Sequence, residues 1–70
     1  MAAILIVEDE EKLRRVMGLH LSSAGYQVRS AASAEEGLRL ASDADLIITD
    51  LKLPGMDGLE FLKQVRAFLG

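Results

Sequence analysis

The spacing of apolar residues changes several times along the chain, and each change predicts a new element. Residues 2–7 (Ala-Ala-Ile-Leu-Ile-Val) are continuously apolar, which is typical of a parallel strand covered on both faces. From Glu10 the period becomes helical, and Gly25 supplies a left-handed stop for this first helix. Residues 26–30 alternate apolar and polar, which predicts a half-exposed edge strand. The apolar stripe of the first helix comprises Leu13, Val16, Met17, Leu21 and Ala24.

Capping and turn residues divide the second half of the chain into a helix, a strand and a last helix. Ser33 and Glu36 form a capping box that starts a short helix, with Ala34, Leu38 and Ala41 as its apolar stripe. Residues 46–49 are apolar and β-branched and predict a third strand, and Leu53-Pro54-Gly55-Met56 fits a type II turn. Asp57 then caps the last helix, with Glu60 at the capping-box distance. Its predicted apolar side comprises Leu59, Leu62, Val65 and Leu69.

Three strand–helix units joined by short connections predict an α/β fold. Such units form a parallel sheet with helices on both faces, and residues 1–70 are expected to form a single domain. Half of the residues are apolar but only 4% are aromatic, so the core is expected to be aliphatic.

Charge and residue usage exclude several classes of function. The formal net charge is −3 and Lys and Arg form no long run, which argues against direct binding of nucleic acid. Cysteine is absent, so disulfides and thiolate metal sites are excluded. The apolar run at residues 2–7 is too short for a signal-peptide core or a membrane span. We therefore expect a soluble cytoplasmic protein with no membrane partner.

Acidic residues follow two of the predicted strands. Glu8 and Asp9 come directly after the first strand, and Asp50 follows the third. Ligands of open parallel sheets bind at the carboxyl ends of the strands, so these three carboxylates converge if the two strands are neighbours. A hard cation such as magnesium relieves their repulsion, and a carboxylate beside it can then attack phosphorus to form an aspartyl phosphate. Asp50 is the better nucleophile candidate, since the turn after it can open a cleft.

Each of these residues also has an ordinary structural interpretation. Asp9 can cap the following helix, and Asp50 can close an Asx turn. Lys52 is interpreted as a solvated loop lysine whose backbone carbonyl is its more interesting atom. His20, beside the stripe of the first helix, is assigned a structural or surface role. A magnesium-dependent aspartyl-phosphate phosphatase ranks last, because it needs a second carboxylate at position 52, which is lysine.

Three segments carry a resemblance to a known family: ILIVEDEEKLRRVM, GYQVRSAASAEEGL and DLIITDLKLPGMDGLEFL. From Ala3 to about Ala67 the chain resembles the receiver domain of bacterial two-component response regulators. The resemblance implies a flavodoxin-like sheet of strand order 2-1-3, with the first helix on one face and the other two on the opposite face. It implies a signalling module rather than an enzyme, in which Asp50 accepts a phosphoryl group from a histidine kinase. Magnesium would be held by Asp9, Asp50 and the Lys52 carbonyl, with Glu8 acting through water.

The chain departs from a complete receiver of this kind after its third unit. Two further strand–helix units would carry a Ser or Thr and a Lys that sense and neutralise the phosphoryl group, and they would build the switching face. All three lysines of the chain, Lys12, Lys52 and Lys63, precede the place of that lysine. The resemblance therefore predicts a receiver truncated to (βα)3 that binds magnesium weakly and is impaired in phosphorylation and switching.

The alternative hypothesis is a non-signalling half-receiver that acts as a homodimerisation or protein-interaction module. In the order 2-1-3 the edge formed by residues 46–50 is bare, and unprotected apolar edges recruit other strands. We therefore expect a homodimer in which this strand meets its symmetry mate antiparallel, giving a sheet ordered 2-1-3-3'-1'-2'.

Overall fold

The computed structural model describes residues 2–50 and 58–69 of the chain. The predicted turn at residues 53–56, the cap Asp57 and Lys52 lie outside these described residues. The described elements, in chain order, are β1 (Ala3–Val7), α1 (Glu11–Ser23), β2 (Gln27–Ala31), α2 (Ala34–Leu40), the short 3-10 helix η1 (Ala41–Asp43), β3 (Leu46–Thr49) and α3 (Gly58–Leu69).

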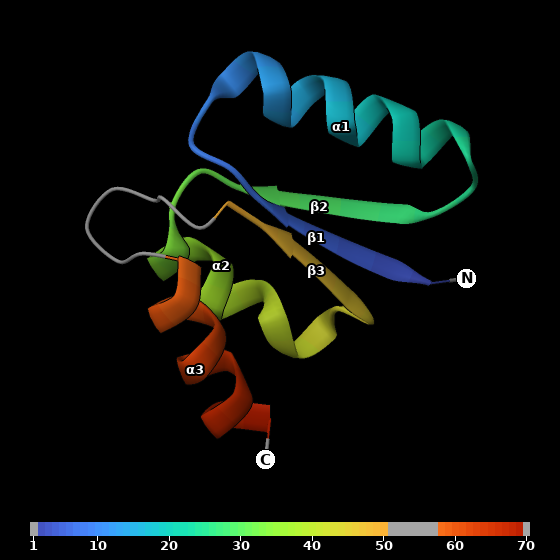
Figure 1. Ribbon diagram of the computed structural model, residues 1–70. Coiled ribbons are helices and arrows are strands. Elements are labelled where there is room, and N and C mark those ends of the chain that lie inside the picture. The colour runs from blue at the N-terminus through green and yellow to red at the C-terminus, as the bar shows by residue number, and fades with distance from the viewer. Residues whose placement is uncertain (1, 51–57, 70) are drawn as a thin grey trace.

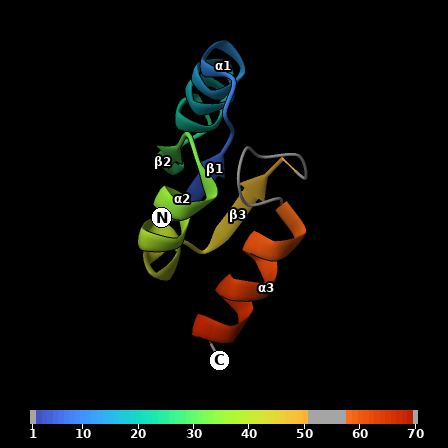
Figure 2. The ribbon, with the colours of Figure 1, turned by 90° about the vertical axis from the view of Figure 1, so that its left-hand side faces the viewer.

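The three strands form one parallel sheet in the order β2-β1-β3. Helix α1 covers one face of the sheet, and α2 and α3 lie on the other (Figures 1 and 2). Val7, the last residue of β1, pairs with Ala31 of β2 and with Thr49 of β3, so all three strands end at the same edge. The predicted fold class, strand order and placement of the helices are confirmed.

Local interactions account for the start of α2, the end of α1 and the start of β2. The Ser33 hydroxyl accepts a hydrogen bond from the Glu36 N–H (3.2 Å), which is the Ser33 half of the predicted capping box. Gly25 has φ of 98°, which confirms the left-handed stop after α1. The second strand begins one residue later than predicted, because the Tyr26 N–H donates to the Leu21 carbonyl of α1 (3.2 Å) and so belongs to the helix end.

The main core lies between the sheet and the pair α2–α3. The expectation of a purely aliphatic core is wrong, because the aromatic Phe61 is fully buried and is the largest core residue. The prediction that Leu59 and Leu62 pack inward is wrong, since both are exposed (60% and 39%). Phe61 and Val65 are four residues apart, so they share one face of α3, and that face lies against the core. The buried core residues are Leu5, Val7, Ala31, Ala34, Ala41, Phe61 and Val65.

The opposite face of the sheet is covered less completely. Ile4 and Ile6 alternate with Leu5 and Val7, so their buried side chains point toward the α1 side. In the predicted stripe of α1, Met17 and Leu21 are partly buried, whereas Leu13, Val16 and Ala24 are exposed. The apolar stripe of α1 is therefore wider than the part of this helix that packs on the sheet.

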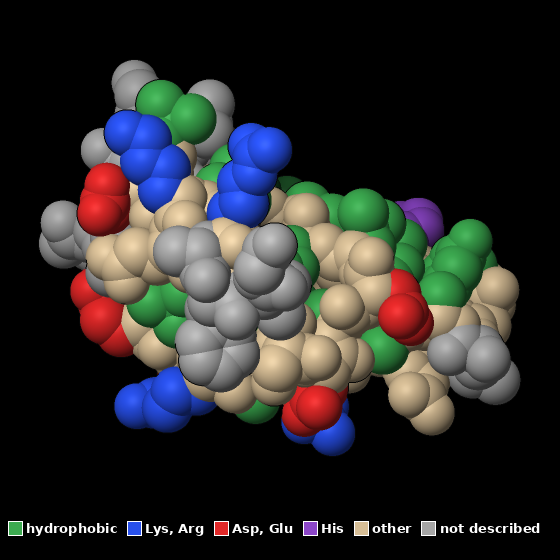
Figure 3. All heavy atoms as spheres, turned by 90° about the horizontal axis from the view of Figure 1, so that it is seen from below, with side chains coloured by type: hydrophobic (Ala, Val, Ile, Leu, Met, Phe, Trp, Pro, Cys, Tyr) green, Lys and Arg blue, Asp and Glu red, His purple; other side chains and the backbone are tan. Residues whose placement is uncertain are grey.

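Hydrophobic side chains also remain visible between the charged ones on the face seen from below (Figure 3). Within residues 2–50 and 58–69, none of the helices has the length and apolar content that crossing a membrane requires.

Gly37 of α2 lies close to side chains of β1 and α3. A Cβ atom at this position would lie 2.8 Å from Val7 Cγ2 and 3.0 Å from Phe61 Cε1. We expect Gly37→Ala to lower the free energy of unfolding by about 1–3 kcal/mol, because overpacking outweighs the higher helix propensity of alanine. Urea denaturation followed by circular dichroism measures the change.

Gly18 of α1 provides the matched control for this prediction. A Cβ atom there would meet only Val28 Cγ1, at 3.9 Å, which is ordinary van der Waals contact. Gly18→Ala is therefore expected to stabilise the chain by up to about 1 kcal/mol. Equal effects of the two substitutions would contradict the packing described for Gly37.

Candidate functional site

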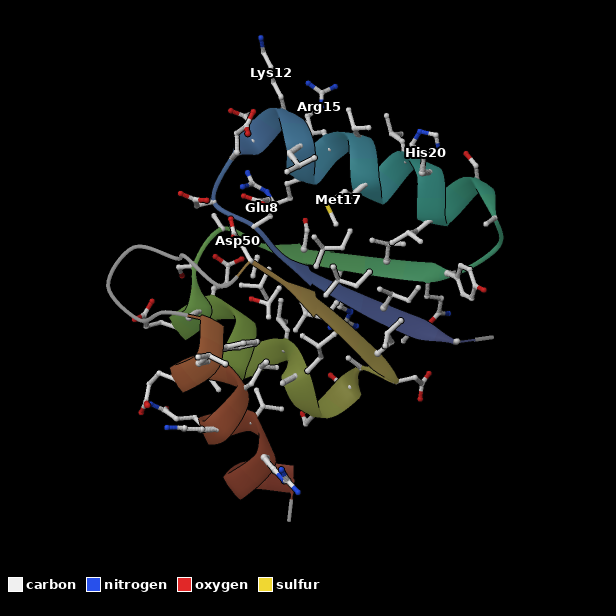
Figure 4. All side chains as sticks on the ribbon, viewed as in Figure 1. Glu8, Lys12, Arg15, Met17, His20 and Asp50 are labelled. Carbon is white, nitrogen blue, oxygen red and sulfur yellow. The ribbon has the colours of Figure 1, made fainter. Side chains whose placement is uncertain are left out.

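Three carboxylates meet at the edge where the strands end. Glu8 and Asp9 follow β1, Asp50 follows β3, and each offers one oxygen such that the three oxygens lie within 4.8 Å of one another. Figure 4 shows Glu8 and Asp50 at the same end of the sheet. The predicted convergence of these residues is confirmed, because β1 and β3 are neighbours in the sheet.

Backbone hydrogen bonds hold the two strand ends in place. The Glu8 N–H donates to the Ala31 carbonyl (3.0 Å), and the Asp50 N–H donates to the Val7 carbonyl (3.2 Å). Glu8 and Asp50 thus each extend the backbone hydrogen bonding of their strand by one residue. The positions of their Cα atoms are fixed by the sheet, which favours a preorganised site.

Glu8 is buried (7% exposed), unlike the exposed Asp9. Its carboxylate Oε2 accepts a hydrogen bond from the Glu10 N–H (3.0 Å), and its carbonyl accepts one from Arg14 Nη1 (2.8 Å). These two contacts close the loop between β1 and α1. Neither the burial of Glu8 nor the contact with Arg14 was predicted from the sequence.

The alternative interpretation of Asp9 as the cap of α1 is wrong. Glu10 occupies the N-cap position, and among the described residues no side chain makes the capping hydrogen bond of this helix. The carboxylate of Asp9 therefore does not cap the start of α1, and it lies with Glu8 and Asp50 instead.

The donor set of the cluster fits a hard divalent cation. Three carboxylate oxygens close together are the ligands that magnesium and calcium prefer, and a cation removes the repulsion between them. The Lys52 carbonyl, the fourth predicted ligand, lies outside the described residues. His20 is exposed and lies on α1 away from Glu8 and Asp50 (Figure 4), so it does not contribute to this site.

Arg14 was detectable in the sequence as a charged residue on the inner side of α1. It precedes Met17, Gly18 and Leu21 by three, four and seven residues, which places it on the same helix face. These four residues are all partly buried. A charged residue on such a face indicates a specific polar partner, which here is the Glu8 carbonyl.

Comparison with known proteins places the chain in one family. The family model described as response regulator receiver domain matches residues 4–68. The transcriptional regulatory protein AfsQ1 of Streptomyces coelicolor is 40% identical over 68 residues, which are 94% of this chain and 30% of AfsQ1. The chain therefore spans less than a third of this relative.

Solved structures agree with the sequence comparison. The chemotaxis protein CheY4 of Vibrio cholerae superposes with a TM-score of 0.91 at 39% identity, over 99% of this chain and 59% of CheY4. The response regulator protein TrrA of Thermotoga maritima, solved in complex with Mg(2+)-BeF, gives a TM-score of 0.89 at 34% identity, over 97% of this chain and 61% of TrrA. With its parallel β2-β1-β3 sheet and a match over nearly its whole length, the chain belongs to the response regulator receiver domain family.

Proposed function

We propose that Asp50 is the phosphoacceptor of a two-component signalling module and receives its phosphoryl group from a histidine kinase. We propose further that Glu8, Asp9, Asp50 and the Lys52 carbonyl hold magnesium, Glu8 acting through water. The observation that carries the proposal is the meeting of three carboxylate oxygens within 4.8 Å at the carboxyl edge of the sheet. The related TrrA, solved in complex with Mg(2+)-BeF, supports magnesium as the cation.

The proposed reaction is a phosphoryl transfer between two side chains. A carboxylate oxygen of Asp50 forms a bond to phosphorus while the P–N bond of the phosphohistidine breaks. The electron pair of that bond stays on the imidazole nitrogen, which takes up a proton from water. When bound, magnesium supplies positive charge that offsets the negative charge of the phosphoryl oxygens and of the carboxylates. Glu8 and Asp9 contribute by holding this charge next to Asp50.

For the 70-residue chain by itself, we propose that phosphorylation is weak. Phosphoryl oxygens need preorganised positive charge, and such charges are worth several kcal/mol of transition-state stabilisation. The lysines of the chain, Lys12, Lys52 and Lys63, all precede the place of the lysine that the family uses for this purpose.

Incubation with acetyl phosphate and magnesium tests the phosphoacceptor assignment. We expect a substoichiometric adduct in the intact mass that depends on magnesium and is lost in Asp50→Asn. Asp43→Asn, which removes a carboxylate from η1, serves as the control and should keep the adduct. An adduct that survives in Asp50→Asn would contradict the assignment, and so would the lack of any difference between the two variants. A stoichiometric adduct would contradict only the proposed impairment.

A second candidate function is homodimerisation through the β3 edge. Among the described residues, β3 pairs only with β1, and Leu46 on this strand is 53% exposed. A second copy of the chain would cover the same surface in both protomers and extend the sheet.

A further inference from the structure

Arg14 of α1 is hydrogen-bonded to the backbone of Glu8, one of the three acidic residues of the site. It lies in the first turns of α1 and is partly buried. Its Nη1 donates to the carbonyl oxygen of Glu8 at 2.8 Å, across six residues of the chain. A charge-assisted hydrogen bond of this length is among the stronger ones in proteins.

The contacts of Glu8 leave its peptide unit little freedom. Its N–H is bound to the Ala31 carbonyl, its carbonyl to Arg14, and its carboxylate to the Glu10 N–H. Asp9 lies between Glu8 and Glu10, both of which take part in these bonds. The backbone of Asp9, from which its exposed carboxylate projects, is therefore restrained on both sides. Without this restraint, binding a cation would have to order the loop first, which weakens affinity.

We infer that Arg14 is a positioning residue that holds the Glu8–Asp9 segment in the geometry that binds the cation. The inference rests on the proposed function, because it takes Glu8, Asp9 and Asp50 as the cation site. In this role Arg14 touches neither the cation nor the phosphoryl group. It acts through the backbone of Glu8, as residues that orient metal ligands commonly do.

Electrostatics and positioning predict opposite effects for the loss of Arg14. A guanidinium near a cation site repels the cation, so charge removal alone would tighten binding. Loss of the hydrogen bond to Glu8 would loosen the segment and weaken binding. The adjacent Arg15 is exposed and points away from the sheet (Figure 4). Arg15→Met therefore removes one positive charge from α1 but leaves the hydrogen bond between Arg14 and Glu8 in place. The two variants thus form a matched pair.

The test is a magnesium titration of the 70-residue chain, followed by backbone amide shifts. In the unsubstituted chain, residues 8, 9 and 50–53 should move first. We expect about tenfold weaker binding in Arg14→Met, at the low end of effects seen when groups that orient metal ligands are removed. Arg15→Met should bind as tightly as the unsubstituted chain or slightly tighter. Binding in Arg14→Met that is unchanged or tighter would overturn the inference.

A metal-free measurement separates this inference from the proposed function. Exchange of the Glu10 amide with solvent should be faster in Arg14→Met than in Arg15→Met, because the bond from Glu10 to the Glu8 carboxylate depends on a fixed Glu8. If magnesium moves other residues first, the proposed site is wrong, while the exchange rates still decide whether Arg14 fixes Glu8. Equal exchange rates in the two variants would overturn the inference even if magnesium binds as proposed.

Arg14→Lys replaces Arg14→Met if the latter does not fold. It keeps the charge but substitutes a single ammonium on a shorter side chain for the planar guanidinium. Weaker magnesium binding at this unchanged charge would support the positioning role. Affinity and Glu10 exchange equal to those of the unsubstituted chain would overturn it.

Discussion

Replacing Phe61 by alanine is expected to leave the chain largely unfolded at room temperature. Phe61 is fully buried and is the largest residue of the core between the sheet and the helices α2 and α3. Truncating such a side chain costs about 3–5 kcal/mol, because it removes apolar contacts and leaves a cavity. A single core in a domain of this size supplies only about 3–5 kcal/mol of stability. Far-UV circular dichroism should show the loss of helix, and urea denaturation should show no cooperative transition.

Leu59 offers a control on the same helix. Its side chain is 60% exposed, so Leu59→Ala removes a leucine from α3 without opening the core. We expect this variant to stay within about 0.5 kcal/mol of the unsubstituted chain, as is usual for surface positions. If both variants unfold to the same extent, α3 does not pack through Phe61 as described.

The sequence predicts well those features that depend on neighbouring residues. The first and third strands follow from continuous β-branched and aliphatic runs, the start of α2 from the capping box at Ser33, and the end of α1 from Gly25. In each case the physical cause lies within a few residues of the element. The strand order and the faces covered by the helices came from the family resemblance, and the structure confirms them.

Features that depend on contacts between distant segments were not predictable in this way. The apolar residues of α3 surround much of the helix, so their pattern does not show that Phe61, rather than Leu59 or Leu62, enters the core. Gly37 is needed only because Val7 and Phe61 approach it from other elements. The hydrogen bond from Arg14 to the Glu8 carbonyl likewise depends on how α1 lies on the sheet. At the site, the sequence predicted the three carboxylates but not the contacts that hold them.

The two edges of the sheet differ in their protection against pairing with another chain. The exposed side chains of β2 include Gln27, Arg29 and Ser30, and polar or charged residues disfavour strand addition. The edge strand β3 has the sequence Leu-Ile-Ile-Thr and carries no charge. If the chain self-associates through its sheet, β3 is therefore the edge that pairs.

Backbone directions identify the residue whose substitution tests this pairing. The Asp50 N–H donates to Val7 of β1, so by the alternation along a strand the N–H of Ile48 also faces β1 and that of Thr49 faces outward. Proline at position 49 removes an outward donor and keeps the bonds to β1. On β2 the Gln27 N–H donates to Ala2, so the same reasoning makes Ser30 an outward residue of the other edge. Thr49→Pro and Ser30→Pro are thus matched substitutions at opposite edges.

The 70-residue chain should sediment as a dimer at micromolar concentration, and Thr49→Pro should convert it to a monomer. The reason is that antiparallel pairing of β3 with its symmetry mate needs the outward N–H groups of this strand, and proline also blocks close approach of the second backbone. Ser30→Pro should remain dimeric, because β2 lies at the far edge of the extended sheet. Ile48→Lys is a second variant that keeps the backbone hydrogen bonds between β3 and β1. It should also weaken the dimer, because it places a charge beside the contact between the two copies of β3. A folded monomer of the unsubstituted chain at these concentrations, or equal dissociation by the two proline variants, would exclude pairing through β3.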